Sequence, residues 1–203
     1  KMRLENTLNK ILIVDFGSQF TQLIARKIRE LGIYCEIVSH KKIEKFTKFE
    51  KNIKGIVLSG GPLNVYESKK VKFNNKILKL GVPVLGICFG HQIIAEALGG
   101  AVRKSPNGWH AGVDSISLNS NAYEYGEDGK KYNLVFSHQD EVQKLPRNAT
   151  LIAGSSTCPN GMFLIKNHIF CTQGHIELDK KFAKIIYDFR KNQIGDSKHQ
   201  HAC

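Results

Sequence analysis

Cys88 is the residue whose type and surroundings point most directly to chemistry. It lies in Gly86-Ile87-Cys88-Phe89-Gly90, between an apolar run at 82–87 and a helical pattern at 92–98. A G-x-nucleophile-x-G sequence at such a junction is typical of a sharp strand-to-helix turn, which projects the nucleophile above a sheet and needs small neighbours. The N–H groups and dipole at the helix start would favour the thiolate over the thiol. Because free cysteines are usually buried and inert, the pattern gains meaning only if the chain also supplies catalytic partners.

A cysteine nucleophile needs a base and a group that orients the base, and His175 with Glu177 can supply both. The pair follows the last expected strand, 168–172. In extended backbone the side chains of residues i and i+2 point the same way, so the carboxylate can hold the imidazole. An isolated H-x-E also occurs on exposed strand ends. The chain order, with a nucleophile turn first and a late His–acid pair, is typical of hydrolases.

The other histidines are weaker candidates for the base, apart from His138, which stays open. His91 lies beside the turn but points off the following helix, away from the sulfur. His110 and His168 are expected in a surface loop and a turn. The remaining three lie in lysine-rich or polar segments: His40, His199 and His201.

Donors for an oxyanion can come from two backbone segments. The N–H of Phe89 directly follows the nucleophile, and Gly60-Gly61 lies in a glycine-rich loop after the apolar run 55–58. Glycine lets backbone approach a substrate closely, although the same loop could be an ordinary tight turn. We therefore predict an oxyanion hole formed by Phe89 and this loop.

The elements that must position these residues alternate between strand and helix up to residue 98. This order predicts a mostly parallel α/β sheet with helices on both faces. The expected strands are 10–14, 34–38, 55–58 and 82–87, and the expected helices are 20–31, 71–80 and 92–98. Three unusual segments, Asp15-Phe-Gly-Ser18, Ser59-Gly-Gly-Pro62 and Cys88, then follow carboxyl ends of strands. They should meet at one edge of the sheet, where ligands bind in such folds.

The second half of the chain is expected to hold shorter strands separated by turns. We predict strands at 101–104, 112–118, 133–137, 150–153, 162–165 and 168–172, and a polar loop at 119–131 with a turn at Glu127-Asp-Gly129. A last helix is expected at about 178–191, with Phe182, Ile185, Ile186 and Phe189 along one side. The whole of 10–192 is expected to form one domain, followed by a polar tail or linker start at 193–203.

Composition restricts the class of protein. The 203 residues are 41% hydrophobic, with no apolar run near the ~20 residues of a membrane span and no secretory signal. The net charge of +12 suggests an anionic partner, but only six of the 30 basic residues are arginines, so nucleic-acid binding is not indicated. Five irregularly spaced cysteines suit a reducing cytoplasm. The sequence has no metal-ligand spacing and no phosphate-binding P-loop, so we expect no metal site.

Four stretches together resemble the class I, triad-type, glutamine amidotransferases. They span roughly residues 10 to 190 and are Ile13-Val-Asp-Phe-Gly-Ser-Gln-Phe-Thr-Gln-Leu-Ile-Ala-Arg26 with Arg29-Glu-Leu-Gly-Ile-Tyr-Cys-Glu36, Leu58-Ser-Gly-Gly-Pro62, Gly81-Val-Pro-Val-Leu-Gly-Ile-Cys-Phe-Gly-His-Gln92 and Ser137-His-Gln-Asp-Glu-Val142. The first stretch is similar to the glutaminase part of GMP synthases, and the others mark the wider family. The resemblance implies an open, flavodoxin-like sheet with added short antiparallel strands.

The resemblance implies roles for matching positions. Cys88 would attack the side-chain amide of L-glutamine, His175 would be the general base and acid, and Glu177 would orient it. Gly61 and Phe89 would form the oxyanion hole. Glutamine would be held by Gln92 and, largely through main-chain atoms, by Ser137, His138, Gln139 and Asp140. No cofactor is implied for this step.

The resemblance also implies a partner. Ammonia would pass to an ATP-pyrophosphatase-type synthetase, present as a further domain or a separate chain, that binds ATP and Mg²⁺ and aminates xanthosine monophosphate. The chain departs from the family at Ile176, where Pro is usual, and at Gly174, where Phe is usual. Two alternatives therefore stay open: a γ-glutamyl hydrolase or peptidase on the same fold, and a non-catalytic interaction domain.

Overall fold

The computed structural model describes residues 8–46, 49–65, 71–120, 122 and 126–178, and its first half is built on parallel strands. These strands are β1 (Lys10–Asp15), β2 (Cys35–Ser39), β3 (Ile53–Leu58), β4 (Val84–Ile87) and, from the end of the described chain, β11 (Ile169–Thr172). They lie in the order β2-β1-β3-β4-β11. Most side chains of β1 and β3 are buried, because helices cover both faces of the sheet.

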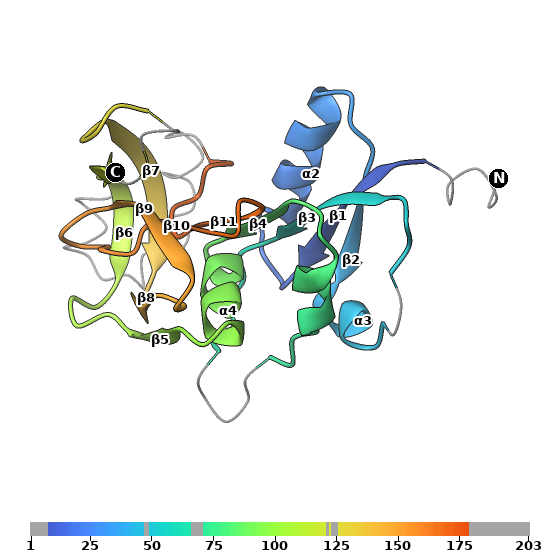
Figure 1. The fold of residues 1–203 in the computed structure, drawn as a ribbon, viewed down its shortest axis with the longest axis horizontal. Helices are drawn as coiled ribbons and strands as arrows, with labels where there is room; N and C mark the ends of the chain where they lie inside the picture. The colour runs from blue at the N-terminus through green and yellow to red at the C-terminus, as the bar shows by residue number, and fades with distance from the viewer. Residues whose placement is uncertain (1–7, 47–48, 66–70, 121, 123–125, 179–203) are drawn as a thin grey trace.

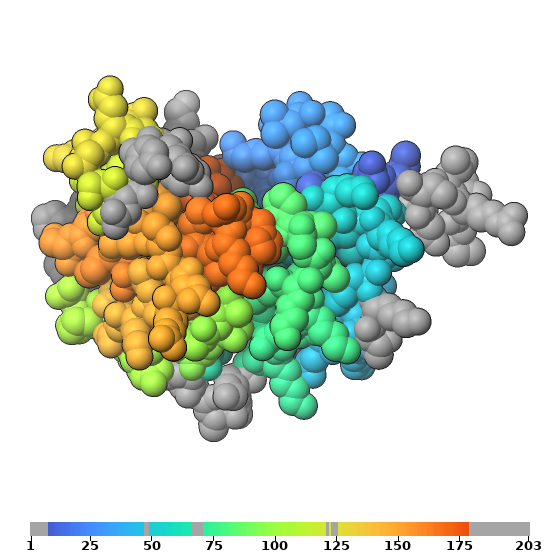
Figure 2. All heavy atoms as spheres, viewed as in Figure 1, coloured from blue at the N-terminus to red at the C-terminus, as the bar shows by residue number. Residues whose placement is uncertain are grey.

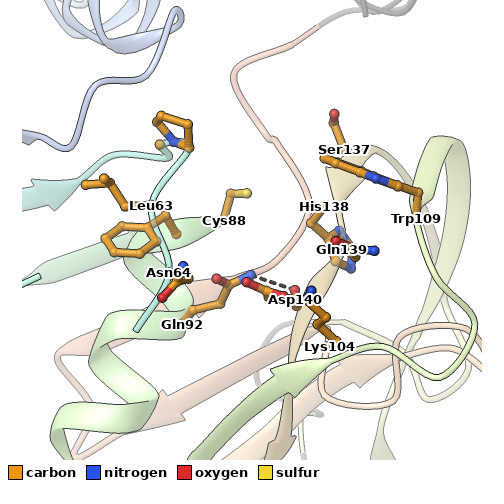
Figure 3. Close-up of a pocket in the computed structure, with 13 residues that line it drawn as sticks. Leu63, Asn64, Cys88, Gln92, Lys104, Trp109, Ser137, His138, Gln139 and Asp140 are labelled. Carbon is orange, nitrogen blue, oxygen red and sulfur yellow. Dashed lines mark hydrogen bonds between the residues drawn. The ribbon is translucent and has the colours of Figure 1, made fainter. Parts of the chain in front are cut away.

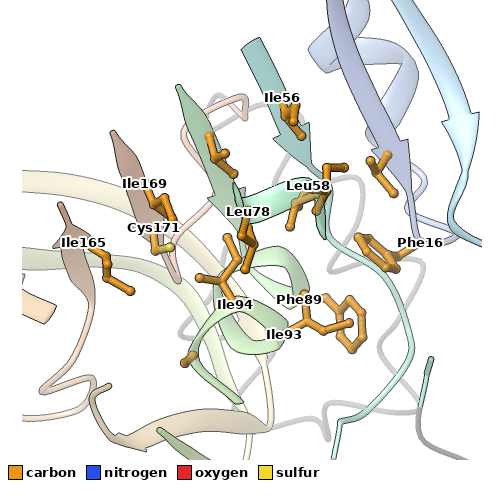
Figure 4. Packing of buried hydrophobic residues seen from close by; sticks show 14 of the residues in the cluster. Phe16, Ile56, Leu58, Leu78, Phe89, Ile93, Ile94, Ile165, Ile169 and Cys171 are labelled. Atoms are coloured by element: carbon orange, nitrogen blue, oxygen red, sulfur yellow. The ribbon is translucent and has the colours of Figure 1, made fainter. Parts of the chain in front are cut away.

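The helices cover the two faces unequally (Figure 1). On one face, α2 (Thr21–Glu30) packs Ile24 and Ala25 against Ile13 and Val57. The other face carries α3 (His40–Glu44), the 3₁₀ helix η1 (Asn75–Lys79) and α4 (Phe89–Ala97). Apolar side chains of these elements form the main core with the sheet (Figure 4). The parallel arrangement predicted from the sequence is confirmed.

Antiparallel strands extend the same sheet. They are β10 (Met162–Ile165), β9 (Ala149–Gly154), β6 (His110–Leu118) and β7 (Lys131–His138), in that order beyond β11. A separate ribbon pairs β5 (Ala101–Lys104) with β8 (Asp140–Lys144). β11 joins the two regions, since it runs parallel to β4 and antiparallel to β10. In the space-filling view, the orange residues of the late strands lie directly against green residues from the middle of the chain (Figure 2).

Two expectations for the elements were wrong. The helix expected at 71–80 is only η1, because the Asn74 side chain accepts from the Lys76 N–H and donates to the carbonyls of Ile43 and Phe46. An asparagine that bonds to nearby backbone competes with helix formation. His110, expected in a surface loop, lies in β6 and stacks on Phe136.

The remaining elements differ in how well the sequence predicted them. β8 was not predicted at all. The turn at Glu127-Asp-Gly129 forms, with the Lys130 N–H bonded to the Glu127 carbonyl and Gly129 at φ 71°. The helix expected at 178–191 and the tail at 193–203 lie outside the described residues. Among the described helices, none combines the length and the apolar character that crossing a bilayer requires.

Candidate functional site

The turn that carries Cys88 is as sharp as the sequence predicts. Cys88 stands between β4 and α4 with φ 54° and ψ −104°, a conformation that non-glycine residues rarely adopt. Its glycine neighbours make the turn possible. A Cβ on Gly90 would lie 2.2 Å from the Leu58 carbonyl oxygen, and one on Gly86 would lie 2.8 Å from the Gly90 oxygen. The strained backbone therefore holds the thiol at the carboxyl end of β4, at the start of a helix.

The Gly60-Gly61 loop packs directly against this turn. The Gly90 N–H donates to the Ser59 carbonyl at 3.1 Å, and the Ser59 hydroxyl accepts from the Phe16 N–H at 3.2 Å. A Cβ on Gly61 would lie 2.4 Å from the Phe16 oxygen, so only glycine fits there. The Phe89 N–H opens α4 and has no partner within the helix, as helix geometry requires. The three loops predicted to meet at one edge of the sheet do meet there.

His175 and Glu177 form a buried pair beside Cys88. The His175 Nδ1 lies 2.7 Å from a Glu177 carboxylate oxygen, and both side chains are about 4% exposed. The His175 N–H donates to the Val135 carbonyl of β7, which anchors this segment to the antiparallel region. Its ring contacts the edge of Phe20, with ring centroids 5.6 Å apart. The imidazole is therefore fixed on several sides.

The electrostatics favour a charged His175. Burial alone would lower the pKa of His175, but its attraction to and hydrogen bond with Cys88, together with the Glu177 carboxylate, raise the pKa to about 10. The Gly60 backbone lies beside both groups, since a Cβ there would be 3.4 Å from His175 Cε1 and 3.6 Å from Cys88 Cβ. The ring of a positively charged His175 therefore lies beside the Cys88 side chain.

A cavity of about 590 Å³ opens in front of Cys88 (Figure 3). Its lining includes every residue predicted to bind substrate or to form the oxyanion hole: Gly61, Phe89, Gln92, Ser137, His138, Gln139 and Asp140. The Gln92 amide nitrogen donates to the Asp140 carbonyl at 2.7 Å, the contact drawn as a dashed line in Figure 3. Since a carbonyl can only accept, the Gln92 amide oxygen is the group left for a ligand.

Two other histidines near this cavity are held neutral. Burial, followed by the neighbouring His110, His175 and His91, keeps the pKa of His138 well below its usual value. Burial lowers the pKa of His91 to about 3, and its ring packs against Phe163 in the core, with centroids 4.8 Å apart. His91 therefore belongs to the core packing of α4. The sequence had predicted only that it points away from the sulfur.

Sequence reasoning missed several residues around the site. Lys104, which ends β5, and Trp109, which precedes β6, line the cavity, as do Leu63 and Asn64. Gln173 bonds to Gln92 from outside the cavity. The positions of Lys104 and Trp109 beside the cavity depend on the pairing of β5 with β8, which the sequence does not reveal. The departure at Gly174 has a packing explanation, because a Cβ there would lie 2.7 Å from Leu134 Cδ1 and 3.1 Å from Phe136 Cζ. Among the described residues, no cluster of His, Cys, Asp and Glu could hold a metal ion.

Comparison with known proteins gives a consistent picture. The glutamine amidotransferase class-I family matches residues 12–190. A protein of Lactobacillus gasseri named GMP synthase [glutamine-hydrolyzing] is 41% identical over 202 residues, covering 94% of this chain but 39% of that protein. The protein of the same name from Wolinella succinogenes is 44% identical over 155 residues, 73% of this chain and 29% of that protein. The chain thus spans about a third of the length of these relatives.

Solved structures agree with the sequence comparison. A protein from Thermoplasma acidophilum, described as a putative subunit of GMP synthase, is 31% identical with a TM-score of 0.72, and the match covers 93% of this chain and 98% of that one. A glutamine amidotransferase from Thermotoga maritima is 25% identical with a TM-score of 0.74, covering 93% and 85%. The fold and the sequence therefore point to the same group of proteins.

Proposed function

The chain belongs to the class I glutamine amidotransferase family, and on that premise we propose that it hydrolyses L-glutamine to L-glutamate and ammonia. The observation that carries this proposal is the buried His175–Glu177 pair beside Cys88, which itself lines the cavity. In the proposal Cys88 is the nucleophile, His175 the general acid and base, and Glu177 the residue that orients His175.

The first half of the reaction forms a thioester. The Cys88 sulfur attacks the side-chain amide carbon, and the carbonyl π electrons move to oxygen, where the N–H groups of Gly61 and Phe89 stabilise the negative charge. His175, protonated because its pKa is raised, gives its proton to the departing nitrogen. The C–N bond breaks, and ammonia leaves a γ-glutamyl thioester on Cys88.

The second half consumes water. His175, now neutral, takes a proton from a water molecule as its oxygen attacks the thioester carbon. The same two N–H groups bear the second oxyanion. When this intermediate collapses, the C–S bond breaks, glutamate is released and the Cys88 thiolate again faces protonated His175. Glu177 stays ionised and holds the imidazole through Nδ1 in both halves.

Substrate binding is assigned to the far wall of the cavity. The free amide oxygen of Gln92 suits the α-ammonium group of glutamine, since the Gln92 nitrogen is already committed to Asp140. Backbone and side chains of the segment Ser137 to Asp140 close the other side. His138, held neutral, can accept or donate a hydrogen bond there.

We extend the proposal to the fate of the ammonia. The names of the relatives support a role in GMP synthesis. We propose that a synthetase partner, with ATP and Mg²⁺ bound to it, aminates xanthosine monophosphate, and that this chain uses no cofactor. A cytoplasmic location is part of the proposal. It is supported by Cys35, Cys88, Cys158 and Cys171, which are unpaired among the described residues.

The decisive experiment measures ammonia release from glutamine by the purified chain, alone and with an ATP-pyrophosphatase-type synthetase. We expect saturable glutamate and ammonia production that Cys88→Ala abolishes, with the circular dichroism spectrum unchanged. Lack of ammonia in both conditions would refute the proposal. Faster turnover of γ-glutamyl peptides than of glutamine would instead favour a γ-glutamyl hydrolase.

A further inference from the structure

Gln173 is a buried amide that touches the substrate wall from outside the cavity. Its side-chain oxygen accepts from the Gln92 amide nitrogen at 3.1 Å, and the same nitrogen donates to the Asp140 carbonyl at 2.7 Å. Gln173 itself is 0% exposed, so no atom of it can reach a molecule in the cavity. The Gln92 side-chain nitrogen, on α4, therefore links Gln173, shortly before His175, to Asp140 at the start of β8.

This double contact determines how the Gln92 amide is turned. An amide can present either its nitrogen or its oxygen, and the two ends differ only in hydrogen-bonding character. Both contacts of the Gln92 nitrogen are acceptors, so a flipped amide would set oxygen against two oxygens. The contact from Gln173 comes from a second direction and restricts rotation of the side chain as well as its flip. The Gln92 side-chain oxygen is therefore held in a single orientation.

Gln173 keeps this position at a cost to stability. Its own side-chain nitrogen is buried and has no hydrogen-bond partner among the described residues. A buried unpaired amide is disfavoured, and a thioether of similar length would avoid that penalty. The hydrogen bond that the Gln173 oxygen accepts from Gln92 explains why an amide stands in such surroundings.

We propose that Gln173 is a positioning residue for substrate recognition, which fixes the amide of Gln92 so that its oxygen receives the α-ammonium group of an α-amino acid amide. The inference rests on the proposed function, because it concerns how glutamine is held in the same site. Gln173 takes no part in bond making. Its loss should weaken binding while leaving the chemistry at Cys88 intact.

The first test compares Gln173→Met with the wild-type chain in glutamine hydrolysis. We expect KM to rise about tenfold, the effect of losing one buried hydrogen bond, with kcat within about twofold. The midpoint of urea unfolding should stay unchanged or rise, since the unpaired nitrogen is removed too. Gln143→Met is the matched control, because Gln143 is exposed on β8 and its side chain makes a long, 3.4 Å bond to the Lys104 carbonyl. Its KM should not change.

Two further measurements separate positioning from a general structural effect. Gln173→Met should react with iodoacetamide at Cys88 as fast as the wild type, but about tenfold more slowly with a glutamine-shaped chloroketone at limiting concentration. In the Gln92→Met variant, adding Gln173→Met should produce little further rise in KM.

The outcomes distinguish this inference from the proposed function. A wild-type chain without glutaminase activity refutes the function. An active wild type with an unchanged KM in Gln173→Met, or with effects at Gln92 and Gln173 that simply add, refutes the positioning role. An equal loss of reactivity toward both alkylating agents also refutes it, since the damage would then lie in the catalytic residues.

Discussion

The parallel and antiparallel regions of the sheet contribute different parts of the site. The parallel region, β1 to β4 with its helices, holds the proposed nucleophile and oxyanion donors in turns that pack closely on one another. The antiparallel region supplies the substrate wall and anchors His175 through Val135. The turn of the proposed nucleophile is thus closed mainly within the parallel region, whereas the proposed base is held by a contact with the antiparallel strands. Four substitutions test this contrast.

Gly90→Ala should have the largest effect, because it breaks the local geometry of the parallel region. The new Cβ would lie 2.2 Å from a backbone oxygen of Leu58, which cannot move aside as a side chain could. We expect a loss of more than about 3 kcal/mol in the free energy of unfolding, measured by urea titration. At the other end of α4, a Cβ on Gly99 would meet open space, although the residue has a φ of 88°. Gly99→Ala should therefore lower the free energy of unfolding by only about 1–2 kcal/mol. Equal costs would contradict the local argument.

Glu177→Gln should affect catalysis more than folding. Without the carboxylate charge the pKa of His175 falls from about 10, and kcat should fall about a hundredfold. Because the reaction needs protonated His175, wild-type activity should persist until the pH approaches 10, and the alkaline limb of the kcat profile should move to lower pH in the variant. A variant profile that overlays the wild-type one would show that Glu177 does not control His175.

The same raised pKa has a consequence for stability. Protonation of His175 favours the folded state because the folded pKa, about 10, exceeds the ordinary value of 6.5. This contribution is complete below pH 6.5 and is lost as the pH rises toward 10. Urea titrations across this range should therefore show a smaller decline for Glu177→Gln than for the wild type.

Gly174→Ala tests the antiparallel side of the contrast. Its Cβ would lie 2.7 Å from Leu134 Cδ1, which can move by side-chain rotation, and 2.8 Å from Leu134 Cβ, which can move only with the β7 backbone. We expect a cost of about 1–3 kcal/mol and a roughly tenfold lower kcat, because the displaced neighbour is His175. Leu134→Ala in the same chain removes the Cδ1 contact but keeps Cβ, so it should recover only part of the kcat. Failure of the second substitution to restore activity would place the effect elsewhere.

Ile176→Pro should have the smallest effect. Ile176 is 46% exposed, and the His175–Glu177 bond is already 2.7 Å long without a proline between the two residues. We expect kcat/KM to change by less than about threefold, which is under about 0.7 kcal/mol. A tenfold increase would mean that the pair in the native chain is poorly aligned.

The sequence predicted the parallel region better than the rest, for the same reason that separates the two regions. Apolar runs such as 10–14 and 82–87 and the glycines around Cys88 express local constraints, so the strands and the turn could be predicted without a partner strand. β8, with the sequence Asp-Glu-Val-Gln-Lys, has no apolar run, and only its pairing with β5 makes it a strand. The helix expected at 71–80 failed because Asn74 bonds to a segment far away along the chain.

The candidate site divides in the same way. Cys88, His175 and Glu177 were predicted from spacing and chain order, and the substrate-binding residues only from the family resemblance. Gln173 could not be assigned a role from the sequence, because its contact with Gln92 depends on β11 lying beside β4. His110 was misplaced because nothing local to it shows that it pairs with His138 across β6 and β7.

The position of β11 in the sheet has a consequence for the order of assembly. β11 is the last strand of the described chain to leave the ribosome, yet it must enter between β4 and β10. Cys88 is therefore translated well before His175, and the Thr172 carbonyl that accepts from the Cys88 N–H also arrives only with β11. Long-range parallel pairing forms slowly. After dilution from urea, we expect iodoacetamide reactivity at Cys88 to rise only with this late step, after most helical signal has returned.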